Sequence, residues 1–153
     1  MKYLLLFLII SFCNFVTAGP LIKGINHLGL SVIDLKASED FFIKYGEFEV
    51  FNRNEEYPSS FLNNGSITIT LWQVNNPETA VKFDRKNNVG LHHVAFNVTS
   101  DKALANLYEA LKKDDSVNIE FAPEFMGKGP TKHMMVYEPS GNRVEFVFRP
   151  SDK

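Results

Sequence analysis

Cysteine is almost absent from this sequence, whose 153 residues include only Cys13. One cysteine cannot form an intramolecular disulfide, and this one lies in an apolar N-terminal stretch. It follows Phe12, which is bulkier than the residue a lipoprotein signal uses before its cysteine. Disulfide scaffolds and thiol catalysis are therefore excluded for the rest of the chain. Stability must come from a packed core, for which one domain of this length is sufficient.

Long apolar runs are missing after residue 20. The single run, from Tyr3 to Phe12, is shorter than the ~20 residues that cross a bilayer. Lys2 precedes it and the small residues Val16-Thr17-Ala18 follow it, which is typical of a secretory signal peptide. We therefore expect residues 1–18 to be a signal peptide cleaved near Ala18-Gly19, and a secreted or periplasmic protein without stable membrane insertion afterwards.

Runs of like charge are also missing. Removing residues 1–18 takes Lys2 from the 16 basic residues and leaves the 18 acidic ones, so the mature chain would carry a net charge of −3. Such a chain has nothing to attract a phosphate backbone, and we expect no nucleic-acid partner. A small molecule is the expected partner.

What is present is a pattern of strands and helices that occurs twice. Apolar and polar residues alternate in residues 24–32 and 91–98, which predicts half-buried strands. Helical spacing follows each of them, at residues 35–46 after an Asp34 cap and at 101–113 after an Asp101 cap, and Gly46 is the predicted stop of the first helix. Three further strands follow each helix, at residues 47–53, 59–64, 66–73, 117–123, 130–138 and 142–149.

The two halves are copies of one unit. His27 and His93 lie 66 positions apart, each in an alternating stretch that leads into a helix. We therefore predict a single α+β domain over residues 19–153, made of two repeated βαβββ modules at about 22–74 and 89–150. The modules would form a half-open, β-barrel-like cup with the helices outside.

Three residues are candidate ligands of a divalent metal at the centre of this cup. His27, His93 and Glu145 lie on strand faces that otherwise carry small or polar residues, and such faces leave room for a ligand. Two imidazoles and a carboxylate can hold a metal facially and leave positions open. The alternative is that each histidine is a hydrogen-bonded structural residue and that Glu145 pairs with Arg143 or Arg149.

The same segments resemble the vicinal oxygen chelate superfamily, which includes glyoxalase I, fosfomycin-resistance enzymes and extradiol dioxygenases. The resemblance rests on residues 24–32, 41–46, 91–98 and 134–148. Its most specific part is residues 138–145, Glu-Pro-Ser-Gly-Asn-Arg-Val-Glu, which is similar to the D-P-x-G-N-x-x-E ending of the family with Glu138 in place of Asp. The resemblance implies that His27, His93 and Glu145 bind the metal.

This ligand set implies Fe(II) or Mn(II) in preference to zinc, although Zn or Ni also fits. The sequence departs from individual branches of the family. Thr70 stands where glyoxalase I has its additional carboxylate, Met135 where extradiol enzymes have a tyrosine, and Gly29 where fosfomycin-type enzymes have a threonine. The sequence therefore does not indicate the substrate of any one of these three branches.

Two more histidines have different expected roles. His133 shares a strand face with Met135 and Tyr137, and is the candidate catalytic residue, as a base or a substrate donor near the metal. A solvated strand histidine is the alternative. His92 alternates out of phase with His93, so we expect it to be structural rather than a ligand.

The resulting hypothesis is a metal-dependent lyase, isomerase or oxygenase that acts on a small molecule chelated through vicinal oxygens. The resemblance further implies a homodimer in which modules from different chains complete each site. Two other hypotheses remain open. One is a protein of the bleomycin-resistance type that binds or sequesters a small molecule without chemistry, and the other is a secreted effector with a vestigial site.

Overall fold

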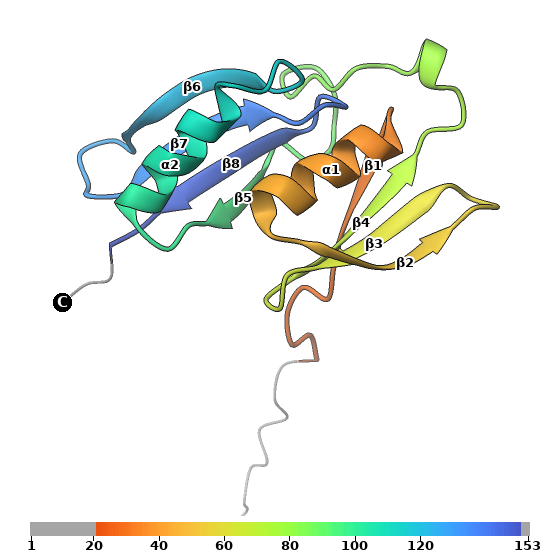
Figure 1. Ribbon diagram of the computed structural model, residues 1–153, viewed down its shortest axis with the longest axis horizontal. Coiled ribbons are helices and arrows are strands. Elements are labelled where there is room, and N and C mark those ends of the chain that lie inside the picture. Colours follow the sequence, from red (N-terminus) through yellow and green to blue (C-terminus); the bar gives the residue numbers. More distant parts are fainter. Residues whose placement is uncertain (1–20, 151–153) are drawn as a thin grey trace, which may run out of the picture.

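The computed structural model describes residues 21–150, and the predicted signal peptide with Cys13 lies outside them. The described chain folds into two four-stranded mixed sheets, each with one helix (Figure 1). This confirms the predicted α+β class with two βαβββ modules, and the strands of residues 21–150 form a cup rather than a closed barrel. The elements are β1 (Leu28–Val32), α1 (Leu35–Gly46), β2 (Glu49–Asn54), β3 (Ser59–Asn63), β4 (Thr68–Gln73), a short 3-10 helix η1 (Pro77–Thr79), β5 (Val94–Asn97), α2 (Asp101–Leu111), β6 (Asn118–Phe125), β7 (Lys132–Tyr137) and β8 (Arg143–Phe148).

The two sheets share one topology. Their orders are β1-β4-β3-β2 and β5-β8-β7-β6, so the first strand of each module pairs with its last. That pairing is parallel, while the other pairs are antiparallel. A parallel pair needs a crossover connection, and α1 and α2 are part of these crossovers. The sequence repeat is therefore a structural repeat.

Helix α1 begins as predicted and ends slightly differently. Asp34 accepts a hydrogen bond from the Ala37 amide (2.9 Å) and caps the first turn. The predicted stop, Gly46, is the last helical residue, and Glu47 takes the left-handed conformation with φ of 55°. Gly46 is required for another reason, because a Cβ there would lie 2.6 Å from the Phe48 ring. The Phe48 ring packs against the helix end and is buried in the core.

Helix α2 corrects one prediction. Ser100, not Asp101, is the cap, because its hydroxyl accepts a hydrogen bond from the Ala103 amide (2.9 Å). Asp101 is the first helical residue, and its carboxylate pairs with Lys132 (2.7 Å). A carboxylate also suits this first turn, where the helix dipole favours negative charge. No helix in residues 21–150 is long and apolar enough to cross a bilayer.

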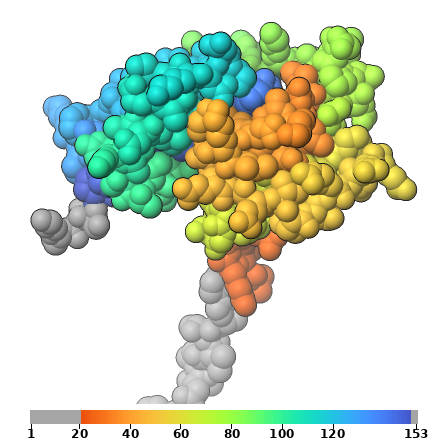
Figure 2. Space-filling view, viewed as in Figure 1, coloured from red at the N-terminus to blue at the C-terminus, as the bar shows by residue number. Residues whose placement is uncertain are grey.

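Both helices lie on the same side of the sheets and bury one common core (Figure 1). Phe96 of β5 packs against Phe42 of α1 and against Phe48, with ring centroids 6.2 and 6.1 Å apart. Figure 2 shows the atoms of the two modules in contact on this helical side. There Asp114, after α2, accepts hydrogen bonds from Lys44 and Tyr45 of α1 (3.0 and 2.7 Å). The opposite faces of the sheets are left for the candidate site.

A buried carboxylate joins the modules at the start of β8. Glu138 is 2% exposed and accepts hydrogen bonds from the Ser38 hydroxyl of α1 (2.6 Å), the Ser140 amide (3.0 Å) and the amide and side chain of Asn142 (2.9 Å each). The Ser140 hydroxyl accepts from the amides of Ile33 and Asp34, and the Asn142 side chain donates to the Ser31 carbonyl. The turn of residues 138–142 therefore links the second module to the β1–α1 connection.

We predict that Glu138→Gln lowers the free energy of unfolding by about 2 kcal/mol, because it places an NH2 group against buried donors that now share a carboxylate. Urea denaturation would measure the loss. The matched control is Glu55→Gln, an exposed glutamate, which we expect to change the free energy by less than about 0.5 kcal/mol. Equal losses for the two variants would contradict the linking role of Glu138.

Candidate metal centre

His27 and His93 occupy equivalent places, directly before β1 and β5. The sequence placed both inside strands, and this detail is wrong. The parallel ladders begin one residue later, with Leu28 opposite Ile69 and Val94 opposite Val144. Each histidine therefore lies one residue before the first paired residue of its strand.

The strand registers explain which donors meet in each sheet. Ala95 lies opposite Glu145 in the second sheet, and Gly29 lies opposite Thr70 in the first. Thr70 thus occupies the position in β4 that Glu145 occupies in β8. Its hydroxyl is buried and accepts a hydrogen bond from the Trp72 indole N–H (2.8 Å). The first sheet offers an imidazole at this place without a carboxylate.

Glu145 is held between two imidazoles. Its carboxylate is 8% exposed, with Oε2 at 3.1 Å from His93 Nε2 and Oε1 at 2.5 Å from His133 Nδ1. Pairing of Glu145 with Arg143 or Arg149 was the alternative, but within residues 21–150 the carboxylate pairs with the two histidines, and Arg143 pairs with Glu120. The structure therefore brings His93, His133 and Glu145 together on one sheet face.

His133 donates to Glu145, because an ionised carboxylate only accepts. A neutral His133 then carries its proton on Nδ1 and has an unprotonated Nε2, which lies 4.0 Å from Glu124. The ring packs against Phe121 with centroids 4.9 Å apart, and its side chain is 16% exposed. His133 thus combines a fixed ring with a free acceptor nitrogen.

His27 lies apart from this cluster. It is exposed, and its Nδ1 lies 2.9 Å from the side-chain oxygen of Asn26. Within residues 21–150, no group of three or more His, Cys, Asp and Glu side chains is arranged to hold a metal. One chain therefore presents two of the three predicted ligands together, with the third at the edge of the other sheet.

The pair that does meet fits a metal ion. Ligand atoms about 2.1 Å from a divalent metal and at right angles to each other are separated by about 3 Å. His93 Nε2 and Glu145 Oε2 are 3.1 Å apart. Imidazole nitrogen and carboxylate oxygen also suit the divalent metals expected from the sequence.

A charged cluster that the sequence did not predict flanks this pair. Glu120 of β6 accepts two hydrogen bonds from Arg143 (2.6 and 3.0 Å) and one from Arg85 (3.1 Å), which also donates to the Tyr137 hydroxyl. Hydrogen bonding to Arg143 holds the pKa of Glu120 below its usual range despite partial burial. Burial and the Arg143 charge lower the pKa of His92, which lies between Arg143 and His93.

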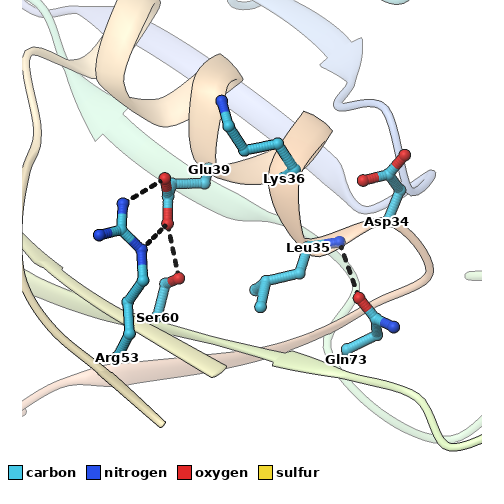
Figure 3. A pocket seen from close by; sticks show the side chains of 7 residues that line it. All are labelled: Asp34, Leu35, Lys36, Glu39, Arg53, Ser60 and Gln73. Carbon is cyan, nitrogen blue, oxygen red and sulfur yellow. Dashed lines mark hydrogen bonds and ion pairs between the residues drawn. The ribbon is translucent and has the colours of Figure 1, made fainter. Parts of the chain in front are cut away.

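A cavity of about 400 Å³ lies elsewhere, between α1 and the first sheet (Figure 3). Glu39 points from α1 towards Arg53, whose guanidinium donates two hydrogen bonds to it (2.7 and 3.1 Å), and Ser60 donates a third (2.6 Å). Gln73 accepts from the Leu35 amide. This cavity is on the helical side, away from the sheet faces that carry the candidate ligands, and its central carboxylate is already paired.

Comparison with known families supplies the identity of the fold. Residues 24–146 match the model of the Glyoxalase/Bleomycin resistance protein/Dioxygenase superfamily. The chain belongs to this superfamily. Members of the superfamily commonly use divalent metals.

Solved structures of the superfamily share the fold at low sequence identity. A glyoxylase/bleomycin resistance protein/dioxygenase domain from Frankia sp. EAN1pec has a TM-score of 0.73 and 19% identity, covering 86% of this chain and 96% of that one. A fosfomycin resistance protein from Listeria monocytogenes has a TM-score of 0.66 and 17% identity, and the match covers 86% of this chain and 97% of that one. A possible glyoxalase from Bacillus cereus has a TM-score of 0.64 and 23% identity, and the match covers 82% of this chain and 99% of that one. Comparison with curated proteins finds no match.

The Glu120 cluster makes stability depend on pH in a defined direction. Because the pKa of Glu120 is lowered in the folded protein, its contribution is fully present above the ordinary glutamate pKa and is lost as pH falls towards the folded value. We predict that Glu120→Gln lowers the free energy of unfolding by about 1–3 kcal/mol at pH 7. The gap between wild type and variant should narrow below about pH 4, measured by urea denaturation at each pH. A gap that stays constant from pH 7 to pH 3 would contradict this assignment.

Proposed function

We propose that the protein is a divalent-metal-dependent enzyme of this superfamily, acting on a small molecule that presents two adjacent oxygens to the metal. The observation that carries the proposal is the 3.1 Å separation of His93 Nε2 and Glu145 Oε2 on one sheet face. Glyoxalases, fosfomycin resistance proteins and dioxygenases share this family. The reaction is accordingly proposed as a lyase, isomerase or oxygenase reaction of such a chelating substrate.

The third ligand in this proposal is His27 of a second copy of the chain. His27 is exposed at the edge of the first sheet and donates through Nδ1 to Asn26, so a neutral ring has its Nε2 unprotonated. A homodimer that sets the first sheet of one chain against the second sheet of the other would bring His27 to His93 and Glu145. Closed two-fold symmetry would create two equal sites.

An apolar surface on the first sheet supports such pairing. Phe51 and Tyr57 are 63% and 51% exposed and belong to a chain of ring contacts with Phe61 and Trp72, whose centroids lie 5.2–6.2 Å apart. Phe61 and Trp72 flank Thr70 on the face that Gly29 shares. Contiguous exposed aromatic surface is typical of a site that another molecule covers.

Two imidazoles and one carboxylate favour Fe(II) or Mn(II), and Zn or Ni remains compatible. When bound, such a metal would polarise the substrate's adjacent oxygens as a Lewis acid. Glu145 and His93 would bind it from β8 and from the residue before β5. His133 would hold Glu145 in place through Nδ1–H and would take a proton from the substrate at Nε2, as a general base.

One other function has an observation in its favour. A single chain gathers two of the three ligands, and the first sheet carries exposed aromatic rings, which suits a protein that sequesters a planar small molecule without chemistry. Secretion or periplasmic location, proposed from residues 1–18, is compatible with either function. Metal content separates the two.

The first test is metal binding by the purified protein after anaerobic loading with Fe(II) or Mn(II). We expect one metal per chain by mass spectrometry, and at least a tenfold loss in affinity for Glu145→Gln, because that change removes a charged ligand. Glu49→Gln, an exposed glutamate of β2, is the control and should bind like wild type. Absence of stoichiometric metal in the wild type would overturn the enzyme proposal and leave sequestration.

A second variant, His27→Ala, tests together with Glu145→Gln whether two copies share the site. Each variant by itself, His27→Ala or Glu145→Gln, should not hold the metal. When the two variants are mixed and exchange chains, half of the dimers are mixed and each mixed dimer has one intact site of two. About a quarter of all sites should therefore bind the metal again. No recovery in exchanged dimers would contradict a site completed by a second copy.

The loaded protein would then be screened with vicinal diols, 2-oxoaldehydes and catechols while oxygen consumption is followed.

A further inference from the structure

The residue before each candidate ligand histidine touches the histidine's Nδ1. His92 Nδ1 lies 2.9 Å from His93 Nδ1, and the two rings meet nearly edge to face, at 74° with centroids 5.2 Å apart. Asn26 Oδ1 lies 2.9 Å from His27 Nδ1. His92 and Asn26 occupy equivalent positions, 66 residues apart, in the two modules. The contact is thus part of the structural repeat, although the two residues differ chemically.

In the first module the direction of this hydrogen bond is fixed by chemistry. An amide oxygen only accepts, so His27 Nδ1–H is the donor. The ring nitrogen that remains on a neutral His27 is Nε2, without a proton and exposed. That is the nitrogen with which we propose His27 binds the metal.

In the second module a neighbouring arginine fixes the direction. Arg143 Nη1 lies 3.4 Å from the same Nδ1 of His92, and a guanidinium only donates. A proton on His92 Nδ1 would face this cation, so the nitrogen presents its lone pair. Arg143 itself is held by two hydrogen bonds to Glu120 and is 8% exposed. With His92 Nδ1 as the acceptor, His93 Nδ1 is the donor. His93 Nε2 lies 3.1 Å from Glu145 Oε2, and a metal bound between these two atoms would take the place of the proton that they share without it.

We propose that His92 and Asn26 are positioning residues, each accepting the Nδ1 proton of the next histidine so that Nε2 is presented to a divalent metal. Arg143, fixed by Glu120, keeps His92 in the accepting state. Partners of this kind set the tautomer and the ring orientation of metal-bound histidines, and losing one typically weakens metal binding about 10–100-fold. His92 therefore acts through His93 rather than as a ligand.

The inference rests on the proposed metal site, and its test uses Zn(II), which is diamagnetic, as the probe. The full protein would be titrated with Zn(II) against a chelator of known affinity. His92→Phe, which keeps a ring of similar size and removes the acceptor, should weaken Zn(II) binding about 10–100-fold. His92→Asn, which copies the residue of the first module, should restore affinity to within about threefold of wild type.

Nitrogen-15 NMR of the Zn(II)-loaded protein gives a readout that loss of packing alone would not reproduce. In wild type and His92→Asn, His93 should bind through Nε2 and show a protonated, hydrogen-bonded Nδ1. In His92→Phe the Nδ1 proton should exchange rapidly with water, while the backbone amide spectrum shows the same fold.

The outcomes separate this inference from the proposed function. Wild-type protein that binds no Zn(II) would overturn both. Wild type and His92→Phe that bind Zn(II) equally, or a wild-type His93 that binds through Nδ1, would overturn the positioning role alone. Failure of His92→Asn to restore affinity would also overturn it, because an accepting oxygen would then be present without effect.

Discussion

The buried carboxylate of Glu138 is the interaction on which the arrangement of the candidate site depends. It gathers the turn of residues 138–142 and binds that turn to Ser38 of the first helix, so the second module is held by the first at the point where β8 begins. Leaving such donors unpaired in the core would cost about 1–3 kcal/mol for each group. The segment of residues 138–145 thus has a structural role in its first half and carries the proposed ligand Glu145 in its second half.

From β8 the site follows by strand geometry. Parallel pairing with β5 sets Ala95 opposite Glu145, and antiparallel pairing with β7 brings His133 to its other side. The same topology in the first module sets Gly29 opposite Thr70, which supplies no carboxylate. One fold used twice therefore gives two unequal halves: one with a carboxylate between two imidazoles, and one with a single exposed imidazole beside aromatic surface.

The repeat, the fold class and the grouping of His93 with Glu145 could be predicted from the sequence, because alternation and strand order depend on local patterns. Features set by tertiary contacts could not. Glu120 pairs with Arg143 across a part of β6 whose register shifts, and no spacing reveals that contact. The cap of α2 is Ser100 rather than Asp101, and the sequence could not distinguish them because both are good capping residues and they lie one position apart. His92 was expected to be structural, but its contact with Arg143 could not be predicted, because it depends on how the chain enters β5.

A crystal structure of the Mn(II)-loaded protein, with anomalous data collected at the manganese edge, would locate the metal directly. If two copies share the site, there will be one anomalous peak per chain, within about 2.2 Å of His93 Nε2 and of a Glu145 oxygen, and equally close to His27 Nε2 of a second copy. A manganese peak elsewhere on the molecule, or a dimer that leaves His27 far from Glu145, would contradict a shared metal site.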